Sequence, residues 1–131
     1  MPSFPVHRDD ASAAFFDGTA RGEFLLVLDT TTGTHHEPAF DVTADPKRYT
    51  RVPAAGGATV VSWSVVHQRG PDGHPSRTTV GIVELDEGPW WWTEIADADP
   101  DTDLMGARVR VDYERVDDGE VQPYFRVAEA T

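Results

Sequence analysis

The chain of 131 residues contains no cysteine and no asparagine. Without cysteine it has no disulfide bond, no thiolate nucleophile and no cysteine-ligated zinc. Without asparagine it has no site for N-linked glycosylation. Long apolar runs are also missing, so no segment is suited to span a membrane, and residues 1–10 lack the apolar stretch of a signal peptide. These absences predict a cytoplasmic protein.

Positive charge is scarce in this sequence. Lysine and arginine number 11 against 23 aspartate and glutamate residues, which gives a formal net charge of -12. A nucleic-acid backbone or an anionic membrane would repel such a chain, so neither is an expected partner. The bias of arginine over the single Lys47, with many alanine, glycine, aspartate and valine residues, is typical of a bacterial protein from a GC-rich genome. The apolar fraction of 39% is enough for one compact domain.

The first elements that the pattern predicts are a helix and a strand. A short helix is predicted over residues 9–16, where Asp9 or Asp10 is placed to cap it and Gly18 is placed to end it. The two phenylalanines of this segment give the helix an apolar edge that must pack against another element. A buried strand is predicted over residues 24–28, because that segment is continuously apolar.

Residues 29–53 show turn signals without sustained periodicity, which predicts a loop-rich insertion holding at most a short hairpin. Beyond it, short apolar segments alternate with polar residues and are separated by glycine and proline turns. The predicted strands are residues 59–68, 77–85, 90–96, 107–116 and 121–127. In the first of these, Val61 and Trp63 are predicted to share one face and Val60 to lie on the other. The fold class predicted is all-β, a small five-stranded Greek-key barrel.

Several segments carry a resemblance to a known family. They are Phe15-Phe-Asp-Gly18, Arg21–Leu26, Gly57–His67, Val83–Gly88 and Met105–Val111, and their order and spacing matter more than any single motif. Together they resemble the acyl-CoA-associated proteins that pair a rubredoxin-like zinc ribbon with a C-terminal OB-fold. The resemblance covers residues 15–127 and implies an OB-fold barrel. It also implies three parts: an N-terminal helical segment (1–22), a ribbon-like region (23–56) and the barrel (57–131).

The ribbon of this family carries two zinc knuckles, and the sequence departs from it there. The knuckle positions fall near Asp29 with Thr32 and near Asp41 with Ala44, and none of them is a cysteine. Structural zinc prefers four thiolate or imidazole ligands. We therefore predict that the zinc has been lost, that no other cofactor replaces it, and that packing by Phe40 and Tyr49 holds the region together.

The family resemblance implies a function through partners. Its members form complexes with thiolases, thiolase-like aldolases of steroid side-chain degradation, acyltransferases or hot-dog hydratases, and the OB-fold docks on the enzyme and contributes to a channel for the acyl-CoA. The chain is accordingly predicted to be a non-catalytic accessory subunit in a hetero-oligomer, with acyl-CoA as a possible ligand. The alternative is a stand-alone domain that binds acyl-CoA or another small molecule. An independent hydratase or thioesterase is disfavoured, because the sequence has no hot-dog central helix and no acid–base constellation.

Aromatic residues are the candidates for binding a partner or ligand. Trp90 and Trp92 must point to one face of a strand and Trp91 to the other, so at least one of them lies outside the barrel interior or at its rim. Two interpretations of this run remain open. The exposed tryptophan forms a partner interface or ligand wall, or loops and the N-terminal helix cover both faces of the strand. The other aromatic candidates are Trp63, Phe15 and Phe16.

Charged residues supply weaker candidates. Arg108 and Arg110 lie on the polar face of one strand, where they suit either CoA phosphates or, as we favour, ion pairs with neighbouring acids. The acidic run Asp97–Asp103 lacks the glycine and glutamate of a calcium loop and is predicted to be solvated. The histidines are predicted to be structural or on the surface: His35, His36, His67 and His74. No catalytic and no metal-binding residue is predicted.

Overall fold

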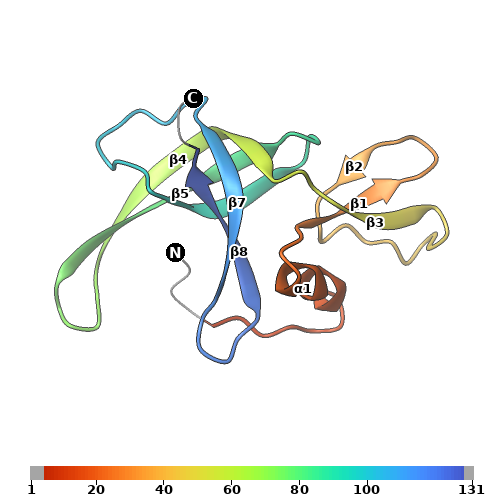
Figure 1. Ribbon diagram of the computed structural model, residues 1–131, viewed down its shortest axis with the longest axis horizontal. Helices are drawn as coiled ribbons and strands as arrows, with labels where there is room; N and C mark the ends of the chain where they lie inside the picture. The colour runs from red at the N-terminus through yellow and green to blue at the C-terminus, as the bar shows by residue number, and fades with distance from the viewer. Residues whose placement is uncertain (1–4, 129–131) are drawn as a thin grey trace.

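The computed structural model describes residues 5–128 (Figure 1). Within this range one helix and eight strands follow one another: α1 (Ala13–Ala20), β1 (Leu25–Asp29), β2 (His35–His36), β3 (Tyr49–Pro53), β4 (Gly57–Arg69), β5 (Pro75–Leu85), β6 (Trp90–Ala96), β7 (Arg108–Arg115) and β8 (Val121–Val127). The strands form a small three-stranded sheet and a closed barrel. In this part of the chain no helix is long and apolar enough to cross a membrane.

The helix begins and ends four residues later than the sequence predicted. The Asp9 carboxylate accepts hydrogen bonds from the backbone N–H of Ser12 at 2.9 Å and from its hydroxyl at 2.8 Å, so this segment forms a turn before α1 rather than its first turn. Gly18 does not stop the helix but lies within it. A side chain at this position would begin 2.7 Å from Cγ of Leu25, so the glycine lets α1 lie close to β1.

The predicted loop-rich region contains more sheet than expected. β1 is central, with β2 on one side and β3 on the other, and all pairings are antiparallel. β3 follows the whole of β1, from Leu25 opposite Pro53 to Asp29 opposite Tyr49. The sequence did not reveal β3 because it is short, ends in proline and is exposed at the sheet edge. Phe40 and Tyr49 pack edge to face at 5.3 Å, so the two predicted anchors are in contact, and their role in holding the region together stays a prediction.

The five strands predicted after residue 57 close into a barrel of order β4-β5-β6-β8-β7, which confirms the predicted architecture. Neighbours are antiparallel except β6 and β8, which run parallel. In β7 the predicted alternation holds at its start, where Val109 is buried between exposed Arg108 and Arg110. The buried core of the barrel consists of Ala58, Val60, Val83, Leu85, Ile95, Leu104, Val109 and Phe125.

The predicted faces of β4 are wrong at one residue. A β-bulge shifts the register between Val60, which pairs with Val83, and Ser62, which pairs with Ile82. The bulge leaves one extra residue on β4, so Val60 and Trp63 both face the inside although they are an odd number of residues apart. Strict alternation cannot reveal such an insertion.

Phe24 joins the small sheet to the barrel. Its ring lies 6.1 Å from that of Phe125 in β8 and 5.0 Å from that of Trp91 in β6, both edge to face. Both parts therefore share one hydrophobic core, to which Phe24 and Leu26 contribute from the sheet side. The division of the chain at residues 22 and 56 stays a prediction.

Gly81→Ala is expected to destabilise the barrel by about 1–3 kcal/mol. A Cβ at this position would lie 2.3 Å from the carbonyl oxygen of Ser62, and the clash is with backbone, so no change of rotamer relieves it. Urea unfolding followed by circular dichroism measures the effect, with Ser64→Ala on the exposed face of β4 as the control. Equal unfolding midpoints for the two variants would contradict the close approach.

Candidate functional site: an aromatic groove beside α1

A groove of about 540 Å³ opens between α1, the loop that follows β2, and the strands β6 and β8. Its walls are mostly aromatic and apolar. They include Phe15, Phe16, Pro38, Trp91, Trp92 and Tyr124. Four of the residues that the sequence singled out for binding therefore meet in one place: the two phenylalanines of α1 and two tryptophans of β6.

The groove follows from the parallel arrangement of β6 and β8. These strands are in register at Ile95 opposite Phe125 and at Ala96 opposite Arg126, near the C-terminal ends of both. Nearer their N-terminal ends, residues 91–94 of β6 and 122–124 of β8 form separate walls of the groove. The helix α1 contacts β8 and β1 and lies beside β8 (Figure 1).

The structure decides the orientation of the tryptophan run. Trp91 packs inward, with its ring 5.0 Å from Phe24 and 5.6 Å from Phe15. Trp90 and Trp92 point to the other face and remain 59% and 64% exposed. Large exposed aromatic side chains next to a groove are typical of binding surfaces. The exposed pair is therefore Trp90 with Trp92, an alternative that the sequence left open.

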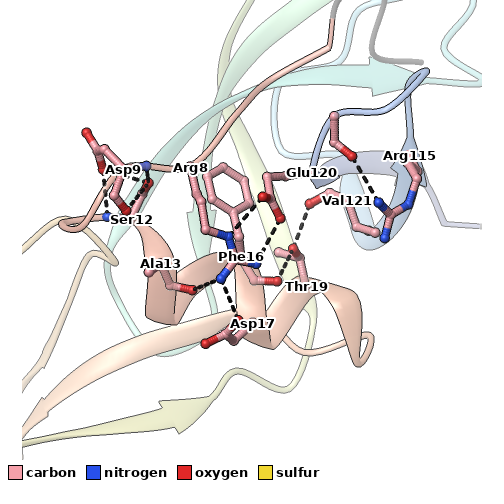
Figure 2. Close-up of polar contacts among 11 residues, drawn as sticks. Arg8, Asp9, Ser12, Ala13, Phe16, Asp17, Thr19, Arg115, Glu120 and Val121 are labelled. Carbon is pink, nitrogen blue, oxygen red and sulfur yellow. Dashed lines mark hydrogen bonds and ion pairs between the residues drawn. The ribbon is translucent and has the colours of Figure 1, made fainter.

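Polar contacts fix α1 against the barrel (Figure 2). The guanidinium of Arg8 donates to Asp17 of the helix at 2.6 Å and to both carboxylate oxygens of Glu120 at 2.9 Å. The buried hydroxyl of Thr19 donates to the Val121 carbonyl oxygen at 2.6 Å. These bonds connect the helix to the turn between β7 and β8, so the groove has a preformed wall.

The carboxylates that line the groove belong to Asp9 and Glu94, and no lysine, arginine or histidine is among its lining residues. Hydrogen bonds from Ser12 lower the pKa of the Asp9 carboxyl, so it stays ionised. Tyr124 brings Arg126 near, because its hydroxyl accepts a hydrogen bond from that guanidinium at 2.7 Å. Arg126 itself is paired with Asp97 and Asp112. The groove is therefore an apolar surface with an acidic rim.

The remaining predicted binding residues lie outside this groove. Trp63 is partly buried and packs against the barrel core. Arg108 donates two hydrogen bonds to the Asp86 carboxylate at 2.8 and 2.9 Å, and lowers the pKa of that carboxyl. This is the ion-paired arrangement that the sequence favoured for Arg108. Arg110 is exposed beside a second, smaller hollow that is also lined by Arg126. A role for any of the three in binding stays a prediction.

The most strongly held carboxylate of the small sheet is Asp29, whose side chain is only 5% exposed. It accepts three hydrogen bonds from the guanidinium of Arg48, at 3.0, 3.0 and 2.7 Å. Backbone N–H groups of Thr31 and Thr32 donate to it as well, at 2.9 and 3.3 Å. Arg48 is the main cause that holds the pKa of the Asp29 carboxyl well below its usual range.

The residues at the expected zinc positions do not fit a structural zinc site. The Asp29 carboxylate is bonded to Arg48, Oδ1 of Asp41 accepts two hydrogen bonds from Thr43, and Ala44 has no ligand atom. Within residues 5–128 no three or more histidine, aspartate or glutamate side chains gather as a metal site would require. His36 instead stacks on Phe40 at 3.9 Å.

Asp29→Asn is expected to lower stability at neutral pH, by an amount that shrinks in acid. A lowered pKa means that the folded protein binds fewer protons than the unfolded chain, whose carboxyl titrates near 3.8. The stabilisation is therefore complete above that value and is lost as the pH falls from it through the folded-state pKa. Urea unfolding of both proteins between about pH 6 and pH 2.5 measures the difference. A difference that does not vary with pH, or an equal effect of Asp118→Asn, would contradict this assignment.

Comparison with known proteins agrees with this architecture. Residues 51–114 match the family model of the ChsH2 C-terminal OB-fold domain. The barrel is an OB-fold. A solved structure described as "Ltp2-ChsH2(DUF35) aldolase" is similar over 97% of this chain and 98% of its own chain, with a TM-score of 0.75 and 22% sequence identity. No curated protein sequence matches the chain. The OB-fold part of the predicted family resemblance is therefore supported.

Sequence reasoning missed several contributors to these sites, including Glu94 on β6. Pro38 and Tyr124 enter the groove from segments far from β6 in the sequence. Arg48 is the residue just before β3, and its guanidinium contacts the carboxylate of Asp29 on the neighbouring strand β1. A signal for this ion pair was Asp29 itself, a charged residue at the end of a continuously apolar segment, because a buried carboxylate needs a charged or hydrogen-bonding partner.

Proposed function

We propose that this chain is a cytoplasmic, non-catalytic accessory subunit that docks on an enzyme of acyl-CoA metabolism. The observation that carries the proposal is the pair Trp90 and Trp92, more than half exposed beside a preformed apolar groove. Solvent exposure of two such side chains costs free energy in an isolated subunit, and a partner that covers them regains it. The rigid support from α1 and Phe24 keeps the surface in place for docking.

An aldolase of the Ltp2 kind is the partner we favour. The similar solved structure is that of an Ltp2–ChsH2 aldolase, and its likeness to this chain covers the small sheet and the barrel alike. At 22% identity this likeness concerns the fold, so the choice of partner is an inference from the shared architecture and the exposed tryptophans. A thiolase or a hydratase is the next choice within the same class.

Co-expression with an Ltp2-type aldolase from the same organism tests the proposal. Sedimentation velocity is expected to show a hetero-oligomer at micromolar concentrations, and aldol cleavage is expected to depend on the complex. The isolated chain serves as the control and is expected to show no turnover. If the two proteins sediment independently, and a thiolase and a hydratase from the same organism do so too, the proposal is wrong.

Binding of acyl-CoA or another small molecule without a partner is the second candidate. The groove volume of about 540 Å³ lies in the range of small-molecule sites. Calorimetry with octanoyl-CoA and the isolated chain separates the two functions, because binding without the aldolase favours a stand-alone role. In the accessory role, acyl-CoA is held only where both proteins line the channel.

We also propose that the ribbon-like region folds without zinc. The support is that Asp29 and Asp41 are already hydrogen-bonded within the chain and that Ala44 cannot bind a metal. Elemental analysis is expected to find zinc far below one ion per chain, and chelation by EDTA is expected to leave the thermal midpoint unchanged. A midpoint that falls on chelation and recovers with zinc would overturn this.

A further inference from the structure

The outer face of the barrel next to Trp92 carries a second surface that adjoins the groove. We infer that the partner enzyme covers this face of β4 and β5 as well as the groove, and that the enzyme's matching surface is uncharged there. This inference rests on the proposed function and adds to it the extent of the docking surface and the chemistry of the partner's side.

The register of the strands shows which side chains share this face. Trp92 of β6 lies opposite Ile82 of β5, which lies opposite Ser62 of β4, so these three side chains form one row across the sheet. Every second residue along a strand points to the same side. The pairs that follow on this side are Ser64 with Val80, Val66 with Thr78, and Gln68 with Ser76. We call the eight residues of these four β4–β5 pairs the hairpin face.

The hairpin face carries no charge. All eight of its residues are exposed or half-buried, and none is acidic or basic, in a chain of which 26% of residues are charged. On the opposite face of the same two strands lie Arg69 and Arg77, so charge is missing from one side only. A solvated sheet face normally carries charged residues, which also deter unwanted association. Depletion of charge is instead typical of the centre of a protein interface.

Charged side chains lie at the margin of this surface. Glu94, which lies opposite Val80, is half-buried and already has an interaction within the chain. Asp86, just after β5, is paired with Arg108. Glu84, opposite Trp90, is exposed at the end away from the hairpin tip. A polar rim around an uncharged centre is the usual arrangement of an interface.

The exposed area indicates how far the docking surface extends. Trp90 and Trp92 are 59% and 64% exposed. Together they leave about 300 Å² of mostly apolar surface in water, whereas each partner of a stable complex contributes about 800 Å². The two tryptophans therefore supply less than half of the area that docking needs. The remainder must come from the surfaces that adjoin Trp92, which are the groove on one side and the hairpin face on the other.

The shape of the hairpin face favours a protein over a small ligand. Within residues 5–128, β7 pairs with β4 at residues 57–59 and β6 pairs with β5 at residues 80–84. Beyond them the two strands continue as a two-stranded hairpin that projects away from α1 (Figure 1). A small ligand needs a concave site that encloses it, and a two-stranded ribbon offers none.

Charge selects the enzyme over a second copy of this chain. Each copy carries a net charge of -12, so two copies repel one another. The hairpin face itself has no ion to pair with a lysine, arginine or carboxylate of the partner, and a charge buried against it would lose its hydration without compensation. The enzyme's surface over this face is therefore apolar or polar without charge.

Charges of both signs placed at Ser64, which is exposed in the middle of the hairpin face, test the inference. Ser64→Glu and Ser64→Lys are each expected to weaken the complex with the aldolase at least about tenfold, because either charge would be buried without a partner. The matched controls are His67→Glu and His67→Lys, on the opposite face of the same strand, and both are expected to bind like the wild type.

Calorimetry gives the affinities, and urea unfolding is expected to show unchanged midpoints. The same two changes at Ser62 are used if a Ser64 variant does not fold.

The outcomes separate this inference from the proposed function. Losses for both signs at Ser64 with no loss at His67 support it. If either Ser64 variant binds as tightly as the wild type or more tightly, or if the His67 variants lose as much, the inference is wrong while the accessory role stands. Self-association of the isolated chain that the Ser64 variants abolish also overturns it, because a second copy would then be the occupant. If no complex forms at all, both are wrong.

Discussion

Trp92→Ala is expected to weaken binding to the partner enzyme at least about 30-fold and to leave the folded protein intact. A central aromatic side chain in an interface typically contributes about 2 kcal/mol or more, which corresponds to that factor. Trp92 is 64% exposed, so its removal takes little from the core of the isolated subunit. Calorimetry with the aldolase gives the affinity, and urea unfolding gives the stability.

Met105 provides the matched control for this substitution. It is also 64% exposed, but it lies in the loop between β6 and β7 and does not line the groove. Met105→Ala is therefore expected to bind like the wild type. If the two variants lose affinity equally, exposed apolar area in general, rather than this groove, determines binding, and the site is misplaced.

Phe24→Ala is expected to lower the free energy of unfolding by about 3–5 kcal/mol, the usual cost of removing a buried phenylalanine side chain. Phe24 is 1% exposed and contacts the rings of Phe15, Trp91 and Phe125 edge to face. These rings belong to the helix and to two barrel strands, so the cavity would open at the junction of all the parts. Such a loss approaches the whole stability of many small domains.

Urea unfolding measured by circular dichroism and by tryptophan fluorescence checks this prediction. Phe24→Leu is the milder variant if the alanine variant does not fold, and Val66→Ala on the exposed end of β4 is the control. Because Phe24 joins the sheet to the barrel, both signals are expected to change in one transition. Two separate transitions in the wild type would show that the junction does not couple the parts.

The barrel was predictable because its strands can be recognised from short stretches of the sequence. Each of the five is a short segment rich in apolar residues between turn signals, with alternation clearest in residues 59–68 and 107–116, and the structure forms all five. The helix was displaced because the carboxylate of Asp9 caps a turn instead of the first helical turn. The face of Val60 was misplaced because a bulge inserts one residue without any local sign in an alternating sequence.

The groove was not predictable in the same way. The sequence narrowed the tryptophan run to two alternatives, but only the position of Phe24 and α1 assigns Trp91 to the interior. The contribution of Tyr124 depends on β6 and β8 lying parallel, a pairing between segments about thirty residues apart. The ion pair of Asp29 with Arg48 joins residues 19 positions apart in the sequence, and its geometry arises from the alignment of β3 along β1.

The short parallel pairing between β6 and β8 has a consequence for the local opening of the barrel. β6 and β8 are paired at two positions only, whereas β7 and β8 are paired at seven. Amide protons at this pairing are therefore expected to exchange with solvent through local opening long before the rest of the barrel. A partner bound in the groove would contact both β6 and β8, so it would stabilise their pairing against local opening. Binding of the partner is then expected to slow amide hydrogen exchange along β8 as well as at the residues that the partner contacts.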